Sequence, residues 1–107
     1  MQQLNVRQLA EWLADASRPQ PMLLDVREPS EFELCHLPGS QLIPMHTIPM
    51  RCDELPTEQE IVLICHHGGR SAQVGMFLEH RGFSNVINLS GGVDAWAVEI
   101  DHSMHRY

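Results

Sequence analysis

The chain has 107 residues, of which 43% are apolar and 20% are charged, which suits one folded domain spanning 1–107 and argues against disorder. Its formal net charge is −7, and all seven of its basic residues are arginine, so we expect no contact with nucleic acid or with a membrane surface. Its three cysteines, Cys35, Cys52 and Cys65, are odd in number and widely spaced. This spacing argues against a disulfide framework and a zinc site and favours a reducing, cytoplasmic location, and the N-terminal residues predict neither a signal peptide nor a membrane span.

Short apolar runs alternate with helix-period stretches along the chain, which is typical of an α/β domain with a mostly parallel sheet. In the first helical stretch Asn5 is a suitable N-cap, and Val6, Leu9 and Trp12 share one face. The elements expected up to residue 54 are a helix over 6–16, a strand over 22–26, a short helix over 29–34, a strand over 41–43, and one or two irregular helical turns over 45–54.

The second half contains the strongest predicted strand, Ile61–Ile64, which is apolar throughout as a central parallel strand requires. The elements expected after it are a helix from Ser71 to about Arg81, a strand over 86–89, a helix beginning near Val93, and a polar, irregular tail over 101–107. The tail carries His102, His105 and Arg106, which could fold back toward the rest of the chain.

The segment between strand 61–64 and the following helix carries the clearest chemical signal. It reads Cys65, His66, His67, Gly68, Gly69, Arg70 and Ser71. The glycines let the backbone curl so that several N–H groups point inward, and the helix N-terminus adds positive potential. The segment therefore predicts a small anion-binding loop with Cys65 at its mouth.

A cysteine in such a loop should ionise readily to the nucleophilic thiolate, because the loop stabilises negative charge. The guanidinium of Arg70 can bind an oxyanion through paired hydrogen bonds. The alternative is a glycine-rich strand-to-helix turn that contains a cysteine by coincidence, and the strand before it and the helix after it argue against that reading.

Four segments, in order, resemble the signatures of the rhodanese-like sulfurtransferase domain. They are 23–32, 36–40 with 43–44, the six-residue loop 65–70, and a closing set at 83, 85–86, 89, 91–92 and 95–96. The resemblance runs from about Leu4 to Trp96. It implies a three-layer α/β sandwich in which helices flank a small, mostly parallel sheet of four to five strands. Cys35 departs from the pattern, which usually has glycine before the histidine of the second signature.

The resemblance implies a sulfurtransferase that works through a persulfide on Cys65. Cys65 would take the outer sulfur of thiosulfate or a similar small sulfur-containing anion, and a thiol, cyanide or protein acceptor would then remove it. The backbone of His66, His67, Gly68, Gly69, Arg70 and Ser71 would bind the substrate sulfur, and no metal or organic cofactor would be needed.

Two other functions remain open from the sequence. The domain could be a non-enzymatic persulfide carrier or a sulfur-sensing module for a partner protein. A weaker alternative is a phosphatase or arsenate reductase. Related phosphatases on this fold carry five residues between cysteine and arginine, whereas four separate Cys65 from Arg70, so the shorter loop favours sulfur over phosphorus as the attacked atom.

The residues around this loop also have alternative roles. His66 or His67 could act as a base or as a partner of the thiolate, but we expect semi-exposed loop side chains whose backbone amides matter more. Asp25 and Arg27 should support the loop structurally. Glu28 and Glu31 are expected to be solvated. Cys35 could resolve a persulfide, but an inert, partly buried thiol is the simpler expectation.

Overall fold

The computed structural model describes residues 1–107 and contains one five-stranded sheet. Its order is β1-β5-β4-β2-β3, and every neighbouring pair is parallel. The strands are β1 (Gln2–Leu4), β2 (Met22–Asp25), β3 (Gln41–Leu42), β4 (Ile61–Ile64) and β5 (Val86–Leu89). Because all the strands run the same way, their carboxyl ends meet at one edge of the sheet, where α/β proteins place their ligands.

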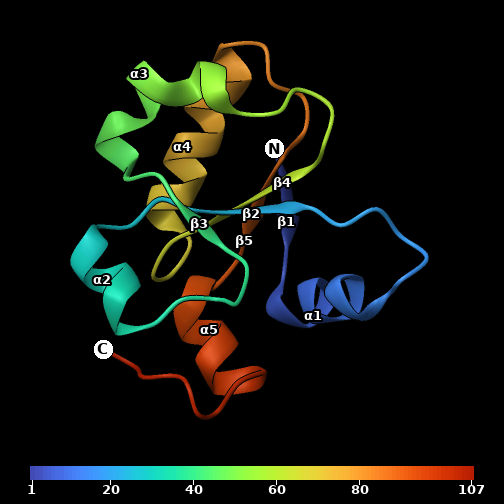
Figure 1. Ribbon diagram of the computed structural model, residues 1–107, viewed down its shortest axis with the longest axis vertical. Coiled ribbons are helices and arrows are strands. Elements are labelled where there is room, and N and C mark those ends of the chain that lie inside the picture. Colours follow the sequence, from blue (N-terminus) through green and yellow to red (C-terminus); the bar gives the residue numbers. More distant parts are fainter.

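Helices cover both faces of the sheet (Figure 1). One face packs against α1 (Val6–Ala14) and α5 (Gly92–Glu99), and the other against α3 (Ile48–Arg51) and α4 (Gly69–His80). The short helix α2 (Pro29–Leu34) lies between β2 and β3, and two 3₁₀ turns, Met45–Thr47 and Cys52–Glu54, flank α3. This is the predicted three-layer α/β sandwich with a parallel sheet.

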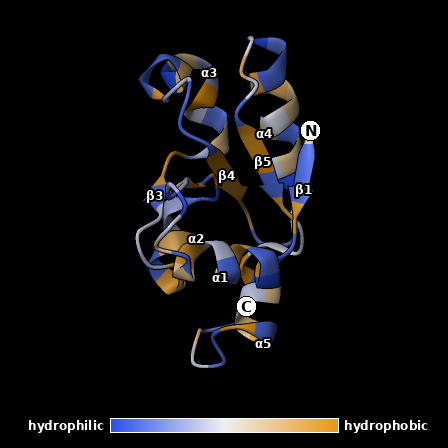
Figure 2. Cartoon of the chain, turned by 90° about the vertical axis from the view of Figure 1, so that its right-hand side faces the viewer, coloured by the Kyte–Doolittle hydropathy of each residue, from blue (hydrophilic) through white to orange (hydrophobic).

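Strand β4 explains why the core has two halves. Val62 and Ile64 belong to the cluster on the α1–α5 side, and Ile61 and Leu63 belong to the cluster on the α3–α4 side. Successive side chains of a strand point to opposite faces, so an apolar run without alternation is buried on both faces. All four residues are fully buried, and Figure 2 shows β4 as a hydrophobic strand between the helical layers.

The element bounds differ from the sequence-based expectations at several ends. Strand β1 was not predicted, because only Leu4 of its three residues is buried and it adds to the edge of the sheet beside β5. Helix α1 ends at Ala14, two residues early, and α4 begins at Gly69, two residues before the expected Ser71. The helical turns expected over 45–54 are present.

Most of the expected local signals are confirmed. Asn5 and Gln8 form a capping box, in which each side-chain oxygen accepts a hydrogen bond from the other residue's backbone N–H at 2.8 and 2.9 Å. Trp12 and Trp96 both lie in the core on the α1–α5 side.

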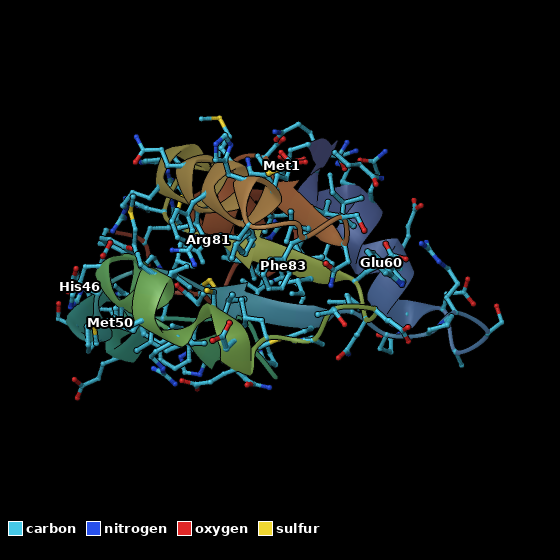
Figure 3. All side chains as sticks on the ribbon, turned by 90° about the horizontal axis from the view of Figure 1, so that it is seen from above. Met1, His46, Met50, Glu60, Arg81 and Phe83 are labelled. Carbon is cyan, nitrogen blue, oxygen red and sulfur yellow. The ribbon has the colours of Figure 1, made fainter.

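Figure 3 views the molecule from the α3–α4 side, with Met50 on the outer surface of α3. None of the helices combines the length and the hydropathy needed to span a bilayer.

Candidate active site

The site is built around Cys65, which follows β4 directly at the carboxyl edge of the sheet. Its side chain is buried, with only 1% of the residue exposed. The sulfur accepts two hydrogen bonds, from the backbone N–H of Gly68 at 3.0 Å and from the hydroxyl of Ser71 at 3.3 Å. Both donors stabilise negative charge on the sulfur, as a nucleophilic thiolate requires.

The loop reaches this geometry through Gly68, which precedes α4 with φ of +108°. That conformation is open to glycine and strained for other residues. Only the Gly68 amide donates to the sulfur, and the amides of Gly69, Arg70 and Ser71 form the first turn of α4. These first-turn N–H groups have no acceptor within the helix, so they remain free for a ligand held beside the sulfur.

Helix α5 supports the loop from the other side. The amides of Val93 and Asp94 donate to the carbonyl oxygens of Cys65 and His66 at 2.9 and 3.1 Å. A side chain at Gly92 would overlap both of those carbonyl oxygens. The first turn of α5 therefore fixes the start of the loop, and Gly92 permits the close approach.

A buried polar side chain on β5 holds the far end of the loop. Asn88 donates from its amide nitrogen to the carbonyl oxygen of Gly68 at 3.2 Å and to the side chain of Gln3 at 2.9 Å. Neither Asn88 nor Gln3 was singled out in the sequence. Gln3 and Asn88 are direct pairing partners in the parallel register of β1 and β5, and this non-local pairing would have been the only signal.

Arg70 lies beside the loop but binds a carboxylate of the protein. Its two terminal nitrogens donate to the two oxygens of Glu31 at 2.7 and 2.9 Å. This pair lowers the pKa of Glu31 to about 2 and raises that of Arg70. The expectation that Glu31 is solvated was therefore wrong, because α2 brings it to the same edge of the sheet as the cysteine loop.

Asp25 and Arg27 form a second ion pair, and both side chains are fully buried. The guanidinium binds the carboxylate through Nε at 2.9 Å and Nη2 at 2.7 Å, and it also donates to the Cys35 carbonyl oxygen at 2.6 Å. A further bond reaches the Glu31 carbonyl oxygen at 3.3 Å. Arg27 thus ties the end of β2 to the middle of α2 and to its C-cap.

The tail folds back onto the site. The ring of Tyr107 stacks on His66 with centroids 4.0 Å apart, and its hydroxyl donates to Glu31 at 2.8 Å and accepts from Arg27 at 2.8 Å. Arg106 binds Asp94 in the first turn of α5 at 3.0 and 3.3 Å. Figure 1 shows the C-terminal end beside α2. Tyr107 was missed in the sequence, because no local pattern marks a contact between the tail and α2.

The two histidines differ in their surroundings. His66 lies between Tyr107 and His67, and its Nε2 atom is buried without a hydrogen-bond partner. Burial, and then the neighbouring His67, lower the pKa of His66 below its usual value, which favours the neutral ring. The His67 side chain is 67% exposed, with Nδ1 4.0 Å from Asp94. No cluster of three histidine, cysteine or acidic side chains is placed to hold a metal ion.

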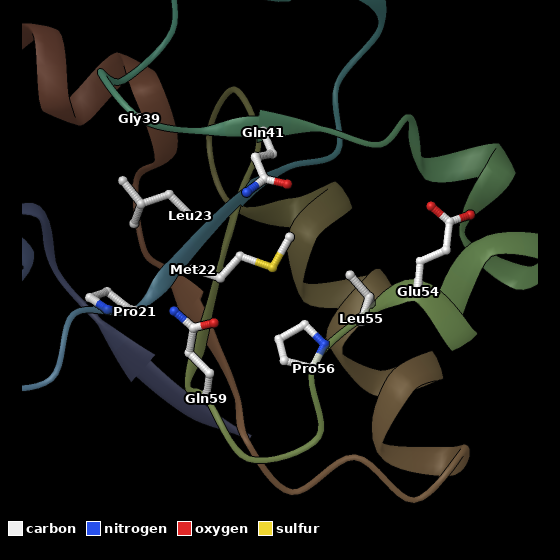
Figure 4. A pocket seen from close by; sticks show the side chains of 9 residues that line it. All are labelled: Pro21, Met22, Leu23, Gly39, Gln41, Glu54, Leu55, Pro56 and Gln59. Atoms are coloured by element: carbon white, nitrogen blue, oxygen red, sulfur yellow. The ribbon is translucent and has the colours of Figure 1, made fainter.

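None of the cavities includes Cys65. The largest, about 450 Å³, lies at the amino ends of β2 and β3, where Met22 and Gln41 face Pro56 and Gln59 (Figure 4). That is the opposite edge of the sheet from the cysteine loop. The buried sulfur of Cys65 therefore lies outside every pocket of the structure.

Most of the chain is similar to a known protein family and to its members. Residues 7–99 match the model of the rhodanese-like domain. A sulfurtransferase of Allochromatium vinosum is 36% identical over 95 residues, which cover 89% of this chain and 87% of that protein. The thiosulfate sulfurtransferase GlpE of Pseudomonas syringae is 36% identical over 84 residues, covering 78% and 79% of the two chains.

Two further likenesses extend this result. The putative sulfur carrier protein YrkF of Bacillus subtilis is 40% identical over 74 residues, 69% of this chain and 40% of that longer protein. The solved structure of a rhodanese-like domain protein from Staphylococcus aureus has a TM-score of 0.84 at 29% identity, covering 100% of this chain and 99% of that one.

The parallel sheet and the cysteine loop at its carboxyl edge define an α/β domain of the rhodanese type. The chain belongs to the rhodanese-like domain family, as its four sequence signatures predicted. Its relatives include sulfurtransferases and a putative sulfur carrier, so donors and acceptors of sulfur are the general class of partner.

Proposed function

We propose that this protein is a sulfurtransferase that carries sulfane sulfur as a persulfide on Cys65. The observation that supports the proposal most directly is the pair of donors on the Cys65 sulfur, Gly68 N–H and Ser71 O–H. Two donors at a helix N-terminus stabilise the negative charge that a nucleophilic sulfur carries when it attacks.

The first half-reaction uses a small anionic donor such as thiosulfate. The Cys65 thiolate attacks the outer sulfur of the donor, a new sulfur–sulfur bond forms at Cys65, and the bond to the inner sulfur breaks. The electron pair of that bond leaves with sulfite. The free amides of Gly69, Arg70 and Ser71 lie where they can stabilise charge on the terminal sulfur.

The second half-reaction returns the site to its starting state. A thiolate, cyanide or a protein cysteine attacks the terminal sulfur of the persulfide, and the electron pair of the broken bond returns to Cys65. The reaction is therefore a double displacement with ping-pong kinetics, in which the donor product leaves before the acceptor binds. No metal or organic cofactor takes part in either half-reaction.

The other predicted site residues have supporting parts in this scheme. Arg70 joins the cysteine loop to α2 through its pair with Glu31, and Arg27, paired with Asp25, binds the backbone of the same helix. His66 and His67 take part in substrate binding through their backbone amides rather than through their side chains. The net charge of −7 argues against nucleic acid and membrane partners, and the three free cysteines suit a reducing, cytoplasmic compartment.

Intact mass spectrometry after incubation with thiosulfate tests the proposal. We expect a mass gain of about 32 Da, one sulfur atom, which a thiol acceptor then removes. Cys65→Ser should take up no sulfur, whereas Cys52→Ser, which changes a buried thiol on the α3–α4 side of the core, should load fully. Full loading of the Cys65→Ser protein would refute the mechanism.

A second candidate is a persulfide carrier for a partner protein. The likeness to a putative sulfur carrier and the burial of Cys65 favour it. The carrier would load sulfur on Cys65, release it slowly to free thiols, and transfer it rapidly to one protein acceptor. A phosphatase or arsenate reductase is less favoured, since Arg70 is paired with Glu31 and not free for an oxyanion. Hydrolysis of a phosphate ester without persulfide formation would support that third function.

A further inference from the structure

Every arginine near Cys65 is already paired with a carboxylate of the protein. Arg27 binds Asp25 at 2.7 Å, Arg70 binds Glu31 at 2.7 Å, and Arg106 binds Asp94 at 3.0 Å. There is no lysine in the chain to add a further positive charge. An anionic donor that approaches the loop therefore meets backbone amides but no uncompensated cation.

The Arg70–Glu31 pair is the one that concerns the substrate, because Arg70 belongs to the cysteine loop. Both terminal nitrogens of its guanidinium are occupied by the two Glu31 oxygens, in the geometry that an oxyanion of a substrate would adopt. Glu31 is in effect an internal anion at the position where a donor's charged oxygens would bind.

Other contacts hold Glu31 in this position. Its Oε1 accepts from the backbone N–H of Glu28 at 3.0 Å, and its Oε2 accepts from the hydroxyl of Tyr107 at 2.8 Å. The Tyr107 hydroxyl is itself held by Arg27 at 2.8 Å. Each carboxylate oxygen thus accepts two hydrogen bonds, and a donor anion must break the bonds from Arg70 before it can use that side chain.

The two common classes of sulfane donor differ in this respect. Thiosulfate is a dianion whose attacked sulfur is attached directly to a group with three charged oxygens. An alkyl persulfide, R–S–SH, carries its attacked sulfur on a sulfur–carbon chain and has no oxyanion next to it. Thiosulfate needs a cation for its charged oxygens, and the Arg70 guanidinium that could serve is bound to Glu31. An alkyl persulfide has no such oxygens and does not need this cation.

We propose, on the basis of the sulfurtransferase function proposed above, that Glu31 is a specificity-determining residue that directs Cys65 toward alkyl persulfides and away from thiosulfate. Cys65 attacks the terminal sulfur of R–S–SH, a sulfur–sulfur bond forms at Cys65, and the bond between the two donor sulfurs breaks. The electron pair leaves on the thiolate RS⁻, so the products are the Cys65 persulfide and a thiol, and no oxidant is needed.

The test measures the loading half-reaction alone, with thiosulfate and with glutathione persulfide as donors. The rate at which Cys65 gains one sulfur is followed by intact mass spectrometry over a series of donor concentrations, which separates the half-saturating concentration from the maximum rate. The variants are Glu31→Gln and Glu31→Ala, which remove the charge and then the whole carboxylate. We expect each to lower the half-saturating concentration of thiosulfate by about tenfold or more, with less than about a twofold change for glutathione persulfide.

A matched control comes from the same chain. Glu54 forms a paired contact with Arg51 at 3.0 Å through each oxygen, on the exposed surface around α3. Glu54→Gln makes the same change of charge and breaks the same kind of ion pair. It should leave the half-saturating concentration of both donors unchanged. This control separates the local effect of Glu31 from a general reduction of the negative charge.

The outcomes divide clearly. Two results would overturn the proposal. Weaker thiosulfate loading in both Glu31 variants would mean that Glu31 orients Arg70 toward the donor, and unchanged loading would mean that Glu31 has no influence on donor binding. If the wild-type protein took up no sulfur from either donor, the sulfurtransferase function itself would fail, which is a different result. Thermal unfolding of each variant shows that the comparison is made between folded proteins.

Discussion

The backbone N–H of Gly68 points at the sulfur of Cys65 across 3.0 Å, and this contact closes the cysteine loop on itself. The two residues are three positions apart, so the loop makes its own donor without help from another element. The conformation that aims the N–H group has φ of +108°. The hydrogen bond to the Cys65 sulfur thus depends on a backbone conformation that glycine adopts readily at position 68.

Gly68→Ala should damage both stability and sulfur loading. The added Cβ would lie 3.3 Å from the Leu89 carbonyl oxygen and 3.3 Å from the Gly91 nitrogen, at a positive φ. We expect a loss of about 1–3 kcal/mol in the free energy of unfolding, measured by urea denaturation, and slower persulfide formation. The control is Gly69→Ala, where a Cβ meets nothing within 4 Å and α4 gains a better helix former. Equal losses in both variants would contradict this account of Gly68.

Ser71→Ala should slow sulfur loading with little effect on the fold. The Ser71 hydroxyl donates to the Cys65 sulfur at 3.3 Å and makes no other hydrogen bond. Losing one such donor corresponds to a rate about 3- to 10-fold lower for formation of the persulfide, measured by quenched-flow mass spectrometry with thiosulfate. Ser71→Thr keeps the hydroxyl and should retain most of the rate. A Ser71→Ala protein that loads at the wild-type rate would show that Gly68 alone stabilises the sulfur.

The cysteine loop could be predicted from the sequence because its parts are contiguous. An apolar strand, two glycines and a helix follow one another between Ile61 and His80, and this order alone places Cys65 at the carboxyl edge of a parallel sheet. The start of α4 was predicted two residues late. Gly69 has low helix propensity, but the N–H groups of the first helical turn need no acceptor within the helix, so α4 can begin at this glycine.

The partners of the loop could not be predicted, because they come from distant parts of the chain. Glu31 and Arg70 are 39 residues apart, and Tyr107 and Glu31 are 76 apart. Their contacts depend on how α2 and the tail pack, which local patterns do not specify. Gly92 was seen as part of a family signature, but its role follows only from the approach of α5 to the Cys65 and His66 carbonyl oxygens.

Asp25→Asn should be strongly destabilising. The change leaves Arg27 buried and charged without its carboxylate, and both side chains are fully excluded from solvent. Breaking a buried pair in this way costs about 3–5 kcal/mol, measured by urea denaturation at neutral pH. The exposed pair between Arg7 and Glu99 is the control, with 75% of the Arg7 side chain accessible, so Glu99→Gln should cost less than about 1 kcal/mol. Similar losses for the two variants would show that Arg27 finds other compensation.

The pH dependence of stability should report the Arg70–Glu31 pair. Bonding to Arg70 is the main cause that lowers the pKa of Glu31 from 4.5 to about 2 in the folded state. A carboxyl group with a depressed folded-state pKa stabilises the fold above its unfolded pKa, and this contribution is lost as the pH falls toward the folded value. Wild-type stability should therefore decline between about pH 5 and pH 2, and the Glu31→Gln protein should decline less steeply over that range.

Because 37% of the Arg70 side chain is exposed, solvent screening makes the difference modest, about 1–2 kcal/mol. Urea denaturation at pH 5 and pH 3 measures it, and parallel pH profiles for the two proteins would mean that the pair adds nothing to stability.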